Sequence, residues 1–365
     1  MTEGVAHLRA LAAEPRPTGS EAAARARRYC ASVLKTKGYT VMERPFEYSA
    51  LAGLYGTPLG GLFALLAIGG GAMAGARANP EISLLVLIGG ALVLLGAGRW
   101  LARRGVLVLP LMRRRGVNLE ATRGDGTPTL WLVAHVDSKS QPVPLVARAA
   151  GIVVLACAWI ASIVMAAIQL LASRPVEWRW IVIAGVIGAL PVLTSTVGKR
   201  SAGAVDNASG VATVLRVAEL LPLKTAIGVL ISDAEELGLA GARVWCGERQ
   251  PASAINVDGV DDAGLLTLMW TRPREGARRL ENVVRVAANA DAAALRLIRL
   301  IPGVLVDAVA FADAGWQVVT ISRGDLGTLR RIHTARDNAS MLEGEGVEIV
   351  ARVLVRATTS LTERA

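Results

Sequence analysis

The stretch AHVDSKSQPVPLVARAAGIVVLACAWIASIVMAAIQLL (residues 134–171) places a candidate metal ligand next to a strongly apolar run. His135 and Asp137 directly follow the strand-like segment TLWLVA, and an imidazole and a carboxylate at a strand end suit a divalent metal. From residue 143 to 171 the only charged residue is Arg148. About 20 apolar residues suffice to span a bilayer as a helix. The stretch therefore predicts a metal site and a membrane span side by side in the chain.

The overall composition favours a membrane protein with a soluble-type part. Of 365 residues, 53% are hydrophobic and 19% are charged, which is too apolar for a purely soluble chain of this size. The net charge is +10, but Lys and Arg cluster beside apolar runs, and no nucleic-acid-binding motif is present. We therefore expect a lipid bilayer as partner and no nucleic acid. The three cysteines are scattered and form no CxxC pair, which fits a reducing compartment.

Four apolar runs occur in two pairs, at residues 51–73 and 82–101 and at residues 143–171 and 178–193. We interpret them as about four transmembrane helices, inserted as two hairpins over residues 51–112 and 143–198. Residues 1–50, 113–142 and 199–365 then form one discontinuous domain, because each hairpin returns the chain to the side that it left. Lys and Arg are concentrated on the flanks next to this domain, which predicts that the domain and both termini are cytoplasmic at an inner or cytoplasmic membrane.

The segments outside the hairpins alternate between strand-like and helix-like patterns. Strands are expected at TAIGVLISD, SAINVD and VVTISRG, and helices at residues 19–37, 280–300 and 345–361. Strands that alternate with helices imply an α/β fold with a mostly parallel, mixed sheet flanked by helices.

Acidic and histidine residues lie at the ends of several of these strands or in the loops that follow. In an open α/β sheet, sites assemble at the carboxyl ends of strands. Imidazole and carboxylate donors suit Zn²⁺, and two ions can share a bridging carboxylate. A double Glu allows one carboxylate to bind metal while its neighbour accepts a proton from water. The candidate residues are His135, Asp137, Asp206, Glu235, Glu236, Asp258 and His333.

The order and context of these motifs resemble the zinc aminopeptidases of metallopeptidase family twenty-eight. The resemblance covers PRPTGSEAAARARRYCASVLKTKGYTVMERPF, GVNLEA, AHVDS, GAVDNASGVATVLRVAELL, SDAEELGLAGAR, INVDGV and HTARDNASML in that order. It implies two zinc ions, with His135 on one and Asp206 bridging both. Glu236, Asp258 and His333 are the remaining ligands, and the resemblance leaves open which of the two ions each of them binds. It further implies that Glu235 is the general base and that Asp137 orients a metal ligand without binding the metal itself.

The resemblance implies an integral-membrane zinc aminopeptidase that hydrolyses the N-terminal residues of peptides, including hydrophobic or membrane-associated ones. One alternative is a glutaminyl cyclase-type aminoacyltransferase on the same scaffold, since HVDSK resembles both groups. A second alternative is a non-catalytic membrane scaffold with a peptidase-like domain. The Gly-rich first apolar run would permit either a homo-oligomer or close helix packing within one chain.

Overall fold

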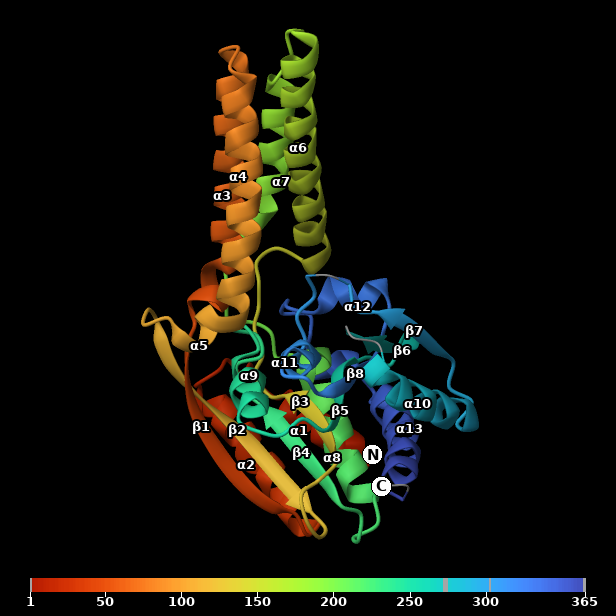
Figure 1. Ribbon diagram of the computed structural model, residues 1–365. Coiled ribbons are helices and arrows are strands. Elements are labelled where there is room, and N and C mark those ends of the chain that lie inside the picture. Colours follow the sequence, from red (N-terminus) through yellow and green to blue (C-terminus); the bar gives the residue numbers. More distant parts are fainter. Residues whose placement is uncertain (1, 272–274, 302, 364–365) are drawn as a thin grey trace. The chain divides into compact units, whose positions relative to one another are not determined.

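In the computed structural model, which describes residues 2–271, 275–301 and 303–363, eight strands form one mixed sheet in the order β1-β2-β4-β3-β5-β8-β6-β7 (Figure 1). Pairing is parallel for β3–β4, β3–β5, β5–β8 and β6–β7, and antiparallel for β2–β4 and β6–β8. The sequence-based prediction of an α/β fold with a mixed sheet flanked by helices is confirmed. The strands are β1 (Thr40–Ser49), β2 (Arg113–Arg123), β3 (Leu130–His135), β4 (Ile227–Ser232), β5 (Ser253–Val260), β6 (Leu265–Trp270), β7 (Leu295–Arg299) and β8 (Gln317–Gly324).

The central strand β3 is buried on both faces, as its continuous apolar sequence requires. Successive side chains of a strand point to opposite faces, so Leu130, Leu132 and Ala134 enter one core while Trp131 and Val133 enter the other. The first core also contains α1 (Glu3–Leu11), α2 (Glu21–Thr36), α8 (Gly210–Leu220), α10 (Arg278–Ala290) and α13 (Glu345–Thr362). The second contains α9 (Ala240–Gly247) and α11 (Asp307–Asp313).

The sheet thus lies between two helical layers. The loops that carry the candidate residues lie at the carboxyl ends of its parallel strands. These loops include the irregular helical segment η2 (Ala204–Ser209), the short helix α12 (Leu326–Arg331) and the 3-10 turn η4 (Ala339–Met341). A further 3-10 turn, η3 (Glu275–Ala277), precedes α10.

The prediction of one long helix over residues 280–300 is wrong. Helix α10 ends at Ala290, Ala292 takes a left-handed conformation (φ 52°), and the chain continues as the edge strand β7. Strand β7 pairs in parallel with β6. The first two residues that face each other across this pairing are Leu266 and Leu295. A long-range partner therefore overrides the local helical pattern of this segment.

By its contacts the chain divides into two units. Unit 1 comprises Met1–Tyr48, Arg113–Ser140 and Lys199–Ala365, and it holds most of the sheet and the candidate residues. Unit 2 comprises Ser49–Met112 and Gln141–Gly198. Its helices are α3 (Leu51–Ala76), α4 (Pro80–Trp100), the π-helical turn η1 (Leu101–Gly105), α5 (Val106–Val108), α6 (Leu145–Ala172) and α7 (Arg179–Leu193).

Within the described residues, three helical stretches are long and apolar enough to cross a membrane, rather than the four that we expected. They are Leu51–Ala76, Pro80–Val108 and Leu145–Ala172. Helix α7 has only 15 residues. At 1.5 Å per residue it covers about 22 Å, less than the roughly 30 Å of a hydrocarbon core. The apolar run predicted at residues 178–193 does form this helix, so the difference lies only in its length.

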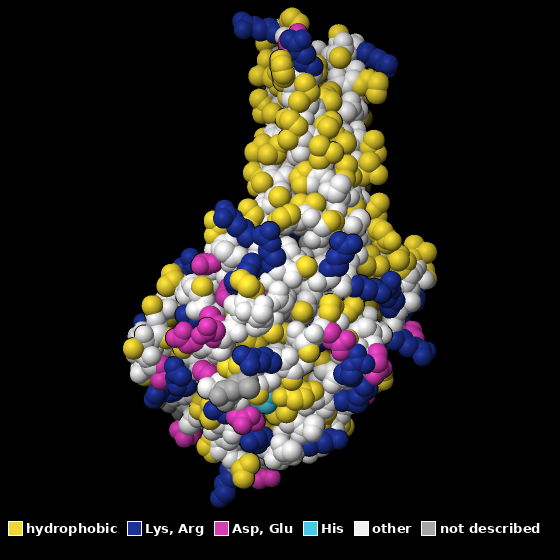
Figure 2. All heavy atoms as spheres, turned by 180° about the vertical axis from the view of Figure 1, so that it is seen from behind, with side chains coloured by type: hydrophobic (Ala, Val, Ile, Leu, Met, Phe, Trp, Pro, Cys, Tyr) yellow, Lys and Arg dark blue, Asp and Glu magenta, His cyan; other side chains and the backbone are white. Residues whose placement is uncertain are grey.

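Unit 2 packs its helices through glycines and leaves its outer surface apolar. An added Cβ at Gly75 would lie 2.3 Å from the buried ring of Trp178, and one at Gly61 would lie 2.7 Å from Val192. Figure 2 shows hydrophobic side chains along the outside of these helices, with charged side chains gathered near the loops. Small residues at the contacts and apolar residues on the outside are the pattern of helices that pack in lipid.

Candidate metal centre

The sheet order places three candidate residues at adjacent strand ends. Strand β3 lies between β4 and β5, so His135 at the end of β3 is flanked by Glu235 after β4 and Asp258 near the end of β5. Nε2 of His135 lies 3.9 Å from a carboxylate oxygen of Glu235 and 3.9 Å from one of Asp258. One donor atom from each of these three residues fits within a common span of 4.8 Å, which suits a metal ion.

The His135 ring is oriented by a backbone group. Its Nδ1 lies 3.0 Å from the carbonyl oxygen of Asp137 and 3.5 Å from Oδ1 of the same residue. A hydrogen bond from Nδ1–H to the carbonyl leaves Nε2 free as a ligand atom, as a metal-binding histidine requires. We expected the Asp137 carboxylate in this role, but the carbonyl is closer.

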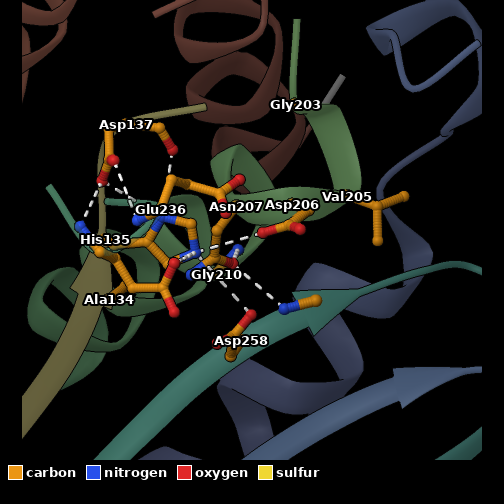
Figure 3. A network of polar contacts seen from close by, with 12 residues as sticks. Ala134, His135, Asp137, Gly203, Val205, Asp206, Asn207, Gly210, Glu236 and Asp258 are labelled. Atoms are coloured by element: carbon orange, nitrogen blue, oxygen red, sulfur yellow. Dashed lines mark hydrogen bonds and ion pairs between the residues drawn. The ribbon is translucent and has the colours of Figure 1, made fainter. Parts of the chain in front are cut away.

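The carboxylate of Asp137 instead supports the loop after β4. Its Oδ1 accepts the backbone N–H of Glu235 at 3.1 Å, and its Oδ2 accepts that of Glu236 at 3.2 Å. Asp137 is fully buried, and Figure 3 shows it beside Glu236. A single carboxylate therefore fixes the backbone from which both glutamates project.

Asp206 faces both histidines. Its Oδ1 lies 3.2 Å from Nε2 of His135, and its Oδ2 lies 2.8 Å from Nε2 of His333. Figure 3 shows Asp206 and Asp258 directed toward His135 from two different elements. A carboxylate with one oxygen toward each of two imidazoles has the arrangement of a bridging ligand.

A second donor group consists of Asp206, Glu236 and His333. Oε1 of Glu236 lies 3.3 Å from Nε2 of His333 and is buried without a hydrogen-bond partner among the described residues. The structure thus brings all the residues predicted from the sequence into one region. It groups Asp258 with His135 and Glu236 with His333, an assignment that the sequence left open.

Two residues that we did not predict hold the Asp206 loop. Asp337 accepts the backbone N–H groups of Val205 and Asp206, at 2.7 and 3.2 Å. Asn207 donates to the carbonyl of Val257 at 2.9 Å, next to Asp258. Asp337 lies in the same HTARDN segment as His333, and its spacing of four residues from His333 was the available signal.

A lysine also lies in the site. The Nζ of Lys139 is 2.5 Å from Oε2 of Glu236, so one oxygen of this carboxylate is engaged while Oε1 remains free toward His333. Burial raises the pKa of Glu236, but the charges of Lys139 and His333 outweigh burial and lower it to about 2. Glu236 is therefore an anionic donor.

Glu235 and Asp307 are buried acids whose pKa values are raised rather than lowered. Burial, with the charges of nearby acids, raises the pKa of Glu235 well above its usual value. Burial likewise raises the pKa of Asp307 to about 7, and the Ser232 hydroxyl donates a hydrogen bond to this residue. Sequence reasoning missed Asp307. The only signal was a lone acid at the end of the otherwise uncharged run LIPGVLVD.

The donor set fits metal ions. Burial would lower the pKa of His135, but Glu235 and the other carboxylates around it raise that pKa well above its usual value. The site therefore favours positive charge beside His135, which a divalent cation would supply. Nitrogen and carboxylate donors without thiolates match catalytic Zn²⁺ sites.

A buried cluster of residues that could hold metal ions, at the carboxyl ends of parallel strands in a mixed α/β sheet, is the site expected of a metal-dependent enzyme. The sequence matches the profile described as Peptidase family M28 over residues 118–358, well over half of the chain. The chain belongs to this family. A search of curated proteins found no match.

The fold is similar to solved structures of two bacterial aminopeptidases. The aminopeptidase from Aneurinibacillus sp. strain AM-1 has a TM-score of 0.58 and 15% identity, covering 99% of this chain and 93% of that one. The zinc aminopeptidase BSAP from Bacillus subtilis has a TM-score of 0.56 and 14% identity, covering 100% and 96%. These identities show a shared fold.

The glutaminyl cyclase of Porphyromonas gingivalis is similar to the same degree. Its TM-score is 0.57 and its identity 16%, with coverage of 100% of this chain and 98% of that one. The family and the aminopeptidase neighbours support a hydrolase of the metallopeptidase kind, with zinc as the implied metal.

Proposed function

We propose that this protein is an integral-membrane zinc aminopeptidase that removes N-terminal residues from peptides. The observation that carries the proposal is Asp206, whose two oxygens face His135 and His333 and so link the two donor groups. Two zinc ions would be held by His135, Asp258 and Asp206 and by His333, Glu236 and Asp206. Zinc at such a site lowers the pKa of a bound water molecule and polarises a carbonyl group.

Glu235 is the general base in this proposal. Its carboxylate belongs to the His135 donor group, but in the proposal Asp206, whose Oδ1 lies 3.2 Å from Nε2 of His135, supplies the third ligand there and leaves Glu235 for proton transfer. It accepts the proton of the attacking water and passes that proton to the leaving amine. The acids of the cluster also favour a substrate whose free N-terminal ammonium lies close to them.

The decisive experiment uses full-length protein purified in detergent and loaded with zinc. We expect release of free amino acids from unblocked peptides and none from N-acetylated ones. Glu235→Gln should lower kcat by about 10²- to 10⁴-fold at unchanged zinc content. Glu219→Gln, which removes a carboxylate outside the site, is the matched control. Full activity of Glu235→Gln would exclude Glu235 as the base.

Glutaminyl cyclase-type chemistry is the second candidate, favoured by Asp307 and by the fold of the P. gingivalis enzyme. Cyclisation of an N-terminal glutamine expels ammonia without water, so a proton must move from the amine to the leaving group. Glu235 and Asp307, two buried acids with raised pKa, are the groups that would relay that proton. Ammonia release from Gln-peptides without free glutamine would establish this activity. A chain that does neither reaction would be a non-catalytic scaffold.

We further propose that unit 2 anchors the protein in an inner or cytoplasmic membrane with unit 1 in the cytoplasm. Strands from all three segments of unit 1 pair in one sheet, so each hairpin must return the chain to the side it left. Helix α7 would therefore cross together with its flanking residues. A reporter fused after Ala365 should be active only on the cytoplasmic side, and activity only outside would overturn the orientation. Peptides that are hydrophobic or membrane-associated are the substrates that such an anchor would favour.

A further inference from the structure

A short N-terminal segment contacts the loops that carry the candidate metal ligands. This segment lies outside the region that matches the family profile. Arg16 lies in the loop between α1 and α2, and its side chain is almost completely buried. Its Nε donates to the carbonyl of Val136 at 2.9 Å, between His135 and Asp137. Its Nη1 and Nη2 donate to the carbonyls of Ala202 at 2.6 Å and Gly203 at 3.1 Å, just before Asp206.

The guanidinium group of Arg16 thus connects the loop of the first histidine ligand to the loop of the shared aspartate. Each of these acceptors is a backbone carbonyl, so the hydrogen bonds fix the course of the main chain. The rigid fork of donors on an arginine can hold two loops at once, which a lysine cannot reproduce.

The backbone of Arg16 strengthens the same connection through Ser138. The N–H of Ser138 donates to the carbonyl of Arg16 at 3.0 Å, and the N–H of Arg16 donates to Oγ of Ser138 at 2.9 Å. That hydroxyl in turn donates to the carbonyl of Ser201 at 3.1 Å. The two chain segments are therefore linked both directly and through Ser138.

This connection spans the point at which the second segment of unit 2 is inserted. Between His135 and Asp206 the chain leaves unit 1 after Ser140 and returns at Lys199. A long insertion does not by itself hold its two ends at a defined distance, since loop closure costs entropy and supplies no contacts. The contacts of Arg16 and Ser138 supply that restraint.

Thr18 reaches the site through a separate contact. Its Oγ1 donates to Oδ2 of Asp137 at 3.0 Å, the same oxygen that accepts the backbone N–H of Glu236 at 3.2 Å. Thr18 therefore helps to orient the carboxylate that fixes the backbone of both glutamates.

We propose that Arg16 and Thr18 are positioning residues of the metal centre, which hold its ligand loops in register across the inserted hairpin. The proposal rests on the metal centre of the proposed function. Removing a residue that orients a metal ligand typically lowers metal affinity by about 10- to 100-fold.

The test measures zinc affinity by chelator competition, and the absorption spectrum after cobalt substitution, in full-length protein in detergent. The variants are Arg16→Lys and Thr18→Val. Arg123→Lys is the matched control, because Arg123 is another buried arginine of unit 1 that donates to backbone carbonyls, those of Lys37, Ala218, Leu221 and Pro222. Thr267→Val is the second control, since Thr267 donates to the carbonyl of Leu265 away from the site.

We expect Arg16→Lys and Thr18→Val to weaken zinc binding by about 10- to 100-fold and to alter the cobalt spectrum. Arg123→Lys should lower the melting temperature but leave zinc affinity unchanged. Equal zinc affinity in wild type and Thr18→Val, together with a purely thermal effect of Arg16→Lys, would overturn the inference. If Arg16→Lys does not fold, Thr18→Val alone decides. A wild-type protein that binds no zinc would overturn the proposed function itself, and this inference with it.

Discussion

Oδ1 of Asp206 lies 3.2 Å from Nε2 of His135, although the two residues are separated by the whole second hairpin. The other oxygen of Asp206 faces His333. Asp206 belongs to the donor group of Glu236 and His333, and its contact with His135 links that group to the other, whereas Asp258 belongs to the His135 group alone.

This arrangement predicts different metal losses for two Asp→Asn variants. Asp206→Asn should weaken both zinc positions, because the amide nitrogen cannot act as a ligand, while Asp258→Asn should weaken only one. Zinc per chain, measured by atomic emission after dialysis, separates the two. Asp291→Asn, at an ion pair with Arg356 far from the site, serves as the control. Equal zinc loss in the two ligand variants would contradict a bridging role.

Metal removal should lower thermal stability. An ion that binds only the folded state at 100 times its Kd adds about 2.7 kcal/mol to the free energy of unfolding. We therefore expect a chelator to lower Tm by several degrees, and added zinc to restore it. The Asp206→Asn variant should show little of either effect. A chelator-independent Tm in the wild-type protein would argue against a resident ion.

The aromatic cluster behind α11 should contribute strongly to stability. The ring of Trp245 lies 4.5 Å from that of Trp131 and 5.6 Å from that of Phe311, measured between centroids, and Phe311 belongs to the helix that begins with Asp307. Trp245→Ala should cost about 3–5 kcal/mol because it leaves a cavity in the second core. Trp180→Ala, at an exposed position, should be nearly neutral by thermal unfolding. A similar Tm for both variants would show that the cluster relaxes around the cavity.

Asp307 predicts a pH dependence in metal-free protein. Burial raises its pKa from 3.8 to about 7, so the folded state binds this proton more tightly than the unfolded state. The corresponding stability is present below about pH 4 and is lost as the pH rises to about 7. Asp307→Asn should remove that loss, on the order of 3 kcal/mol, while keeping an acceptor for Ser232.

Melting curves of wild type, Asp307→Asn and the control Asp291→Asn between pH 4 and pH 8 check this expectation. The Asn variant should gain stability over wild type as the pH rises, and the control should run parallel to wild type. A constant difference across this range would mean that Asp307 does not titrate there.

Two glycines of α3 provide a matched pair for helix packing in unit 2. An added Cβ at Gly75 would overlap the Trp178 ring, whereas one at Gly69 would meet nothing within 4 Å. Gly75→Ala should cost about 1–3 kcal/mol, and Gly69→Ala should be neutral or slightly stabilising. Unfolding in detergent, followed by Trp fluorescence, compares them. Equal effects would indicate that Trp178 moves aside without cost.

The order of strands and helices could largely be read from the sequence, since hydrophobic period and turn residues are local properties. The failures lie where a distant partner decides the outcome. Residues 295–299 carry a helical pattern but form β7, because β6 offers a parallel partner. The apolar run at residues 178–193 forms helix α7 within the predicted bounds, although this helix is shorter than a hydrocarbon core.

For the site, the sequence alone supplied the residue types, since imidazoles and carboxylates at strand ends are visible in the motifs around His135, Asp206, Glu235, Asp258 and His333. Their grouping required the tertiary structure. Strand β3 lies between β4 and β5, so residues about 100 positions apart in the chain become neighbours. The same holds for Arg16, Lys139 and Asp307, whose local sequence shows nothing of the carbonyls and carboxylates that surround them. Chemical character is encoded residue by residue, whereas distance, burial and the resulting charge balance arise only when the sheet brings its strand ends together.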